Sequence, residues 1–178
     1  MVLIVKERKL FFKNWLRLLA FVNDKYDVIP GFGHPNTPVG LDIHDILKIR
    51  DKLWEDSSVI DEYIKTTDLN DEDLTITSSW KKFIKGRFVI VKHLVNFSVL
   101  LDEKNILYGV TGITDSIAEK MPDIPFVIGT VLLPFKGKII YDSIITFPNI
   151  TFGRNYRTSF RETYKKIKRE KGIMTIID

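Results

Sequence analysis

Residues 131–142 read VLLPFKGKIIYD, and this stretch decides how the second half of the chain folds. Two apolar runs flank a short basic break that holds Pro134 and Gly137. Pro134 removes a backbone donor, whereas Gly137 can adopt a positive φ without steric penalty. Two β-rich runs joined by a short segment that contains glycine predict a β-hairpin.

The hairpin continues a β pattern that begins near Gly86, where the spacing of the apolar residues changes from helical to alternating. Strands are predicted where β-branched and aromatic residues gather between turn residues. They cover residues 87–93, 97–101, 106–112, 126–133 and 138–145, with short strands at 150–152 and 173–177. A short helical turn capped by Thr114 or Asp115 is expected before the fourth strand.

The first half of the chain carries a helical pattern instead. Phe11, Trp15, Leu18 and Val22 recur at the spacing of one helix face. Asp42 and either Asn70 or Asp71 are suited to cap helices. Helices are predicted over residues 7–23, 42–55, 57–64 and 72–84, and a last one over 155–170 ends at Gly172.

Helices followed by strands indicate an α+β protein. We expect a helical N-terminal half packed on a mostly antiparallel sheet, which could close into a barrel and is followed by a basic C-terminal helix. The predicted parts are residues 1–85 and 86–178. Because no linker-like composition separates them, we expect the two parts to share one core.

Composition sets limits on the class of protein. The chain has 178 residues, of which 44% are hydrophobic and 12% aromatic, enough to support a packed core. It has no cysteine, which excludes disulfides, thiolate nucleophiles and cysteine-based zinc sites. Charges interrupt the apolar start, and no run approaches the roughly 20 apolar residues of a membrane span. We therefore expect a cytoplasmic protein without a membrane partner.

The strongest positional signal is a row of cations along the last predicted helix. The row repeats at intervals of three or four residues and comprises Arg154, Arg157, Arg161, Lys165 and Lys168. Lys136 and Lys138 of the hairpin could extend the same surface. Such a row predicts contact with the phosphates of RNA or DNA. The alternative is a solvated helix face whose cations suit the C-terminal end of the helix dipole.

Aromatic residues gather around the junction between sheet and helix. They are Phe147, Phe152, Tyr156, Phe160 and Tyr164. Exposed rings beside arginine would suit stacking on single-stranded bases, whereas buried rings would form core between helix and sheet. The pattern favours core. His93, on a predicted strand, is interpreted as a structural histidine.

Two other classes of function stay open. A protein partner could contact the loop at 27–41, which is rich in proline and glycine. A metal-dependent hydrolase would need its strand-end carboxylates, Asp102, Glu103, Asp115 and Asp142, to converge in one cleft. The chain has no phosphate-binding, dinucleotide-binding, zinc-protease or serine-hydrolase motif. The sequence therefore predicts no cofactor or metal site and favours a binding module over an enzyme without deciding between them.

Several segments resemble a family of uncharacterised prokaryotic proteins. The segments are LLPFKGKIIYD (132–142), ITFGRNYR (150–157), KGIMTII (171–177), FVNDKYDVIPGF (21–32) and ILKIRDKLWED (46–56). The resemblance covers most of the chain and implies one folding unit, but it implies no activity and no residue roles. Members of that family tend to have glycine where this chain has Ser143, a difference that would affect a turn or bulge.

Overall fold

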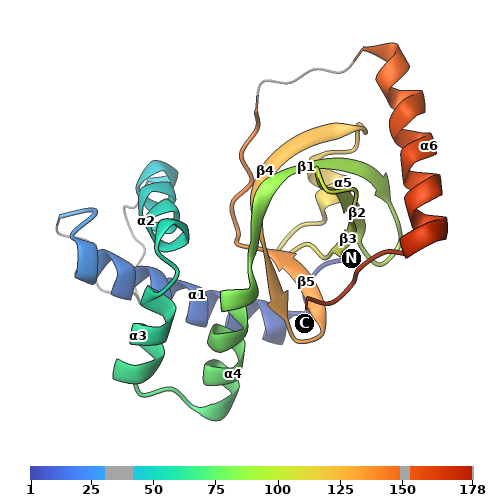
Figure 1. The fold of residues 1–178 in the computed structure, drawn as a ribbon. Helices are drawn as coiled ribbons and strands as arrows, with labels where there is room; N and C mark the ends of the chain where they lie inside the picture. The colour runs from blue at the N-terminus through green and yellow to red at the C-terminus, as the bar shows by residue number, and fades with distance from the viewer. Residues whose placement is uncertain (31–41, 149–152, 178) are drawn as a thin grey trace. The chain divides into compact units, whose positions relative to one another are not determined.

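The computed structural model describes residues 1–30, 42–148 and 153–177. The chain divides into two units, which we describe separately. The helical unit is Val5–Lys81, and the barrel unit is Met1–Ile4 together with Lys82–Asp178. Within the described residues there are six α-helices and a mixed sheet of five strands, so the α+β class is confirmed (Figure 1).

The helical unit contains four α-helices, and side-chain caps mark the starts of the second and the fourth. As expected, Asp42 accepts a hydrogen bond from the backbone of His44 at 3.4 Å, and Asn70 accepts one from the backbone of Asp73 at 2.9 Å. The helices are α1 (Val5–Tyr26), α2 (Ile43–Glu55), α3 (Val59–Thr66) and α4 (Asp71–Ser79).

Tryptophan rings form the centre of the helical unit. Trp15 is buried and stacks on Trp54, with 5.9 Å between ring centroids, and it meets Trp80 edge-on at the same distance. Such pairs add about 0.5–1.5 kcal/mol to the free energy gained by burial alone.

The helix expected over residues 72–84 is shorter than predicted. It ends at Ser79, a single 3₁₀ turn follows over Trp80–Lys82, and Ile84 already begins a strand. Ile84 pairs with Leu132, so the sheet supplies the backbone partners that a longer helix would have provided. Tertiary pairing thus overrides the local helical pattern at this point.

The barrel unit is built on two ten-residue strands, β1 (Ile84–His93) and β4 (Phe126–Phe135), which pair in antiparallel fashion. The shorter strands are β2 (Ser98–Leu101), β3 (Leu107–Val110) and β5 (Lys138–Tyr141). Their order, β1-β2-β3-β5-β4, forms a closed barrel. The closing contact between β3 and β5 is a parallel pair, Val110 with Ile139, and the other strand pairs are antiparallel.

The hairpin predicted at residues 131–142 is confirmed. Phe135 pairs with Lys138 across a two-residue turn in which Lys136 and Gly137 have φ values of 49° and 72°. Two positive φ values are the signature of a type I′ turn, whose twist matches that of the strands. Ser143, the position at which the resembling family tends to have glycine, also lies in the left-handed region, with φ 72°.

Two helices accompany the barrel. The short helix α5 (Ile117–Lys120) begins at Ser116, which forms a capping box with Glu119, so the predicted caps at Thr114 and Asp115 were wrong. The last helix is α6 (Arg154–Lys171), and Gly172 follows it with φ 79°, as expected for a C-terminal glycine.

An apolar cluster fixes α6 on the outside of the barrel. Tyr164 and Ile167 of α6 pack with the buried valines and leucines of β1, β2 and β3. The strand residues of this cluster are Val91, Val99, Leu101 and Leu107. Side chains alternate along a strand, so residues adjacent to these, such as Ile90 and Leu100, face the barrel interior.

The predicted terminal strand is represented by one bridge, between Met174 and Tyr108 of β3. The predicted strand at 150–152 lies outside the described residues. Within the described ranges, no helix combines the length and the apolar character that crossing a bilayer requires.

Candidate functional site

A pocket of about 370 Å³ lies where α6 crosses the end of β1 and the segment that leads into β4. Five of its lining residues are apolar or aromatic: Val91, Ile124, Pro125, Phe160 and Tyr164. The other four are cations: Lys92, Arg157, Arg161 and Lys165. None of the nine described residues that line it is acidic. A pocket with apolar walls and cations around them can hold an anionic ligand that also has an apolar part.

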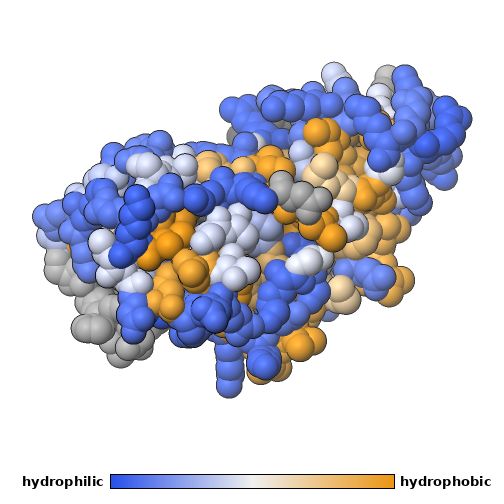
Figure 2. Space-filling view, turned by 60° about the horizontal axis from the view of Figure 1, so that its bottom comes forward, coloured by the Kyte–Doolittle hydropathy of each residue, from blue (hydrophilic) through white to orange (hydrophobic). Residues whose placement is uncertain are grey.

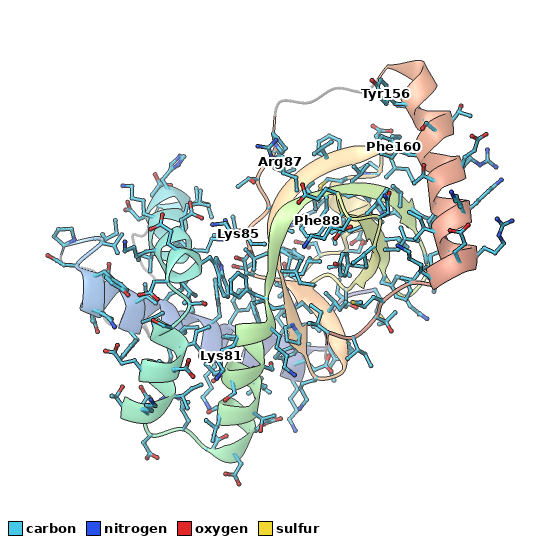
Figure 3. All side chains as sticks on the ribbon, in the orientation of Figure 1. Lys81, Lys85, Arg87, Phe88, Tyr156 and Phe160 are labelled. Atoms are coloured by element: carbon cyan, nitrogen blue, oxygen red, sulfur yellow. The ribbon has the colours of Figure 1, made fainter. Side chains whose placement is uncertain are left out.

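Three of the pocket cations come from the row predicted on the last helix. Arg157, Arg161 and Lys165 follow one another at intervals of four residues, so their side chains lie on one side of α6. All three are exposed. The neighbouring row contains Tyr156, Phe160 and Tyr164, and Figure 3 shows Tyr156 and Phe160 on the side of α6 that faces the barrel. The cationic row therefore runs beside the line along which α6 contacts the barrel.

Lys92 enters the pocket because of an irregularity in β1. The register of β1 with β2 shifts between Ile90 and Lys92. Lys92 then lies opposite Val99, a member of the apolar cluster under α6. A bulge of this kind changes which face of the sheet the following side chain points to. The alternating sequence gives no sign of the bulge, so sequence reasoning missed Lys92.

His93 holds together the strands and the segment that form the pocket wall. Its Nδ1 lies 2.8 Å from Oγ of Ser98, and its Nε2 lies 3.0 Å from the carbonyl oxygen of Met121, four residues before Pro125. Burial lowers the pKa of His93, and Lys92 also lowers it, while the hydrogen bond to Met121 acts in the opposite direction. Both ring nitrogens have protein partners, which supports the interpretation of His93 as a structural histidine.

The pocket is strongly positive because α6 concentrates charge. This helix carries eight lysines and arginines against two glutamates, a net charge of +6, whereas the whole chain has +4. In Figure 2 the α6 end of the view is covered by hydrophilic side chains. In the part of the chain that the structure describes, no carboxylate forms an ion pair with any of the four pocket cations.

The helix dipole explains only some of the cations on α6. Cations are favourable in the last turn of a helix, where Lys168, Arg169 and Lys171 lie. In the first turn they are unfavourable, yet Arg154 and Arg157 lie at the start of α6 and the first turn has no acidic residue. The N-cap, Gly153, makes no side-chain hydrogen bond. A solvated face adapted to the dipole therefore accounts for the end of α6 but not for its beginning.

The structure does not bring all predicted site residues together. The side chain of Arg154 lies outside the described part of the structure. Lys168 does not line the pocket, and its Nζ lies 5.8 Å from the centre of the Tyr164 ring. Lys136 and Lys138 lie at the far end of β4 from Pro125. Ten strand residues span about 33 Å, so the hairpin is not part of this surface.

The carboxylates proposed for a hydrolase have separate structural surroundings. Asp102 accepts hydrogen bonds from the backbone of Lys104 at 2.9 Å and of Ile106 at 2.8 Å, as a turn residue. Asp115 pairs with Lys120 at 2.9 Å, and Asp142 is fully buried. Among the described residues, no group of three or more histidines, aspartates or glutamates could hold a metal ion. The convergence that the hydrolase hypothesis requires is thus not found in them.

Most of the loop at 27–41 lies outside the described residues, which resume at Asp42. Comparison of the chain with protein-family models, curated proteins and solved structures gave no match. The interpretation of the pocket therefore depends on its own residues.

Proposed function

We propose that the protein is a binding module that contacts the phosphates of nucleic acid through the pocket beside α6. The observation that supports this most strongly is the set of four cations around one apolar pocket, with no acidic side chain among the described residues that line it. Cations that converge without pairing repel one another, and a polyanion relieves that repulsion. Three of them come from one helix row, which suits a ligand whose charges repeat along a chain.

The proposed mechanism is phosphate contact without sequence readout. Arg157 and Arg161 each offer a planar guanidinium that can donate two hydrogen bonds to one phosphate, whereas Lys92 and Lys165 act as point charges. Contacts to phosphates determine the position and affinity of the nucleic acid but carry no sequence information. Binding of this kind has Kd values of about 10⁻⁴–10⁻⁶ M at physiological salt.

The architecture supports the proposal by analogy. A five-stranded barrel is also the frame of OB-folds, several of which bind oligonucleotides or oligosaccharides on the face of strands 2 and 3. In this chain, α6 covers the outer residues Val99, Leu101 and Leu107 of β2 and β3. The basic surface of α6 is then the surface that this side of the barrel offers to a ligand. Because one fold serves many functions, the pocket chemistry carries the proposal and the barrel only adds to it.

A salt titration tests the proposal. Binding of a fluorescent oligonucleotide is measured over a series of salt concentrations for the natural protein and for the triple variant R157Q/R161Q/K165Q. Each phosphate contact to a single strand contributes about 0.7 to the slope of log K against log salt. The triple variant should therefore bind with a slope shallower by about 2 and with an affinity at least about 100-fold lower at low salt.

The control is K166Q/R169Q/K171Q, which removes three charges from the same helix at positions that do not line the pocket. It should lose less than about 5-fold in affinity, since only long-range attraction changes. Equal losses in the two variants would show that the charge on α6 acts without a specific site. Absence of binding at low salt by the natural protein would refute the proposal and leave a protein partner as the hypothesis to pursue.

A further inference from the structure

The aromatic residues predicted around α6 divide into buried and exposed members. Tyr164 is 9% exposed and belongs to the apolar cluster, as the core interpretation expects. Tyr156 and Phe147 are 58% and 62% exposed, so that interpretation is wrong for these two. Phe160 is half-buried, packs against the cluster and also lines the pocket. The aromatic residues therefore include exposed rings, Tyr156 and Phe147, as well as one ring, Phe160, that lines the pocket.

Each ring of α6 is followed directly by a cation. The pairs are Tyr156-Arg157, Phe160-Arg161 and Tyr164-Lys165, and they recur every four residues. Four residues of α-helix rise about 6 Å, which is comparable to the separation of successive phosphates in an extended single strand. A strand that runs along α6 could therefore place its phosphates on the cations and its bases toward the rings.

The apolar part of the pocket is suited to a planar ring. Ile124 and Pro125 from the segment before β4 line the pocket together with Phe160, and the volume of about 370 Å³ falls at the low end of ligand pockets. A base in a duplex is stacked on its neighbours and cannot enter, whereas a base of a single strand can leave the stack and pack on an aromatic ring.

A second ring surface lies beyond Pro125. Phe126 follows Pro125 directly and meets Phe147 edge-on, with 5.9 Å between the ring centroids. Phe126 is itself 36% exposed. The two phenylalanines follow the barrel segment that lines the pocket, and Tyr156 precedes the pocket residue Arg157 on α6, so exposed rings lie next in sequence to residues of both pocket walls.

We infer that the pocket beside α6 lodges one unstacked base of a single-stranded nucleic acid against Phe160, while Arg157 and Arg161 contact the phosphates next to that base. This inference rests on the proposed function and adds the class of nucleic acid and the part of it that enters the pocket. The bases flanking the lodged one stack on Tyr156 and on the Phe126–Phe147 pair. Stacking is tolerant of base identity, so the site selects single strands rather than sequences.

The test separates bases from phosphates. The 178-residue protein is titrated with four labelled probes of about twelve units each: oligo-dT, oligo-rU, oligo-dT in which the central four positions are abasic, and a DNA duplex. The abasic probe keeps the phosphates and removes the bases. Oligo-dT or oligo-rU should bind at least about 10-fold more tightly than the abasic probe and the duplex at equal salt. The comparison of dT with rU shows which sugar the site prefers.

Two variants locate the effect. Phe160→Leu keeps an apolar side chain for the cluster but removes the ring, so it should reduce oligo-dT binding by about 10-fold with no change in binding of the abasic probe. Phe160→Tyr retains the ring and should restore the preference for bases. Tyr156→Ala changes an exposed residue and should reduce oligo-dT binding by about 10-fold with no change in binding of the abasic probe.

Each outcome is decisive. Equal, salt-dependent binding of all four probes would overturn the inference while leaving the proposed function in place. A preference for bases that is undiminished in Phe160→Leu would overturn the assignment of the base to this pocket. Absence of binding to every probe would refute the proposed function itself, and the inference with it.

Discussion

The helical unit and the basic helix α6 both carry many charged side chains, but the two regions differ in how their cations are paired. In the helical unit, cations pair with carboxylates from elements that are distant in sequence. The pairs are Lys13 with Asp73, Lys25 with Glu62, and Lys81 with Asp61. In the pocket beside α6, the four cations have no carboxylate among the lining residues.

The difference separates charges that stabilise the fold from charges that we propose to contact a ligand. Asp73 is buried and receives hydrogen bonds from Lys13 at 2.5 Å and Asn14 at 2.8 Å. Burial raises the pKa of this carboxyl, but the two hydrogen bonds outweigh it, and the pKa is lowered. A paired charge of this kind belongs to the structure. Arg157 has no ion pair with any residue that the structure describes and makes no comparable contribution to stability, which is why we propose a ligand for it.

Replacing Asp73 should have the largest effect on stability. Asp73→Ala leaves Lys13 and Asn14 without their partner and should lower the free energy of unfolding by about 2–4 kcal/mol. Urea unfolding followed by tryptophan fluorescence measures this loss, since three tryptophans lie in the helical unit. Asp71→Ala, an exposed change in the same helical turn, is the control and should cost less than about 1 kcal/mol. Equal losses in the two variants would mean that the buried hydrogen bonds of Asp73 contribute no more to the free energy of unfolding than an exposed carboxylate does.

A change at His93 should have an intermediate effect that depends on pH. Burial holds the pKa of His93 below its ordinary value, so the folded protein binds this proton less readily than the unfolded chain. The stabilising contribution is complete above the unfolded pKa of about 6.5 and is lost as pH falls through the folded pKa. His93→Gln should lower the free energy of unfolding by about 1 kcal/mol near pH 8. It should also abolish the part of the loss of stability at falling pH that is due to His93.

The measurement is urea unfolding at several values between about pH 8 and pH 5. Lys92 is the charged group that acts on His93, so Lys92→Gln serves as the companion variant. It should leave the direction of the pH dependence unchanged and reduce its size. An identical decline in His93→Gln and in the natural protein would assign the effect to other groups. Loss of the decline in His93→Gln would show that hydrogen bonds of a neutral histidine hold the pocket wall, whereas ion pairs hold the helical unit.

The smallest effect is expected at the start of α6. Arg157→Glu replaces an unfavourable charge by a favourable one near the helix N-terminus and should raise the free energy of unfolding by about 0.3–1 kcal/mol. The same change should weaken oligonucleotide binding, because Arg157 lines the pocket. Thermal unfolding and a binding titration on one sample measure both quantities. A loss of stability together with binding would place Arg157 among the structural charges of the helical unit instead.

Most of the individual elements could be predicted from local pattern. The turn at Lys136 and Gly137, the caps at Asp42 and Asn70, and the glycine that ends α6 follow from residue types at fixed spacing. One prediction failed locally, because Ser116 caps α5 instead of Thr114 or Asp115. Another failed because a distant partner decided. The helix expected to reach Ile84 stops earlier because that residue pairs with Leu132, far along the chain.

The residues of the site also fall into those that local sequence pattern predicts and those that it does not. The row that contains Arg157, Arg161 and Lys165 could be predicted, because the period of an α-helix places every fourth residue on one side. Lys92 and Pro125 could not be placed beside that row from sequence, because they reach it through a strand bulge and through the pairing of segments far apart in the chain.

By itself the sequence determined the α+β class, the hairpin and the cationic row, because each depends on backbone geometry that repeats within a few residues. Only the tertiary structure decided that the barrel closes, that the row meets an apolar pocket, and that Tyr156 and Phe147 are exposed while Tyr164 is buried. The physical reason is that burial and convergence depend on which surfaces cover one another, and local periodicity does not specify that.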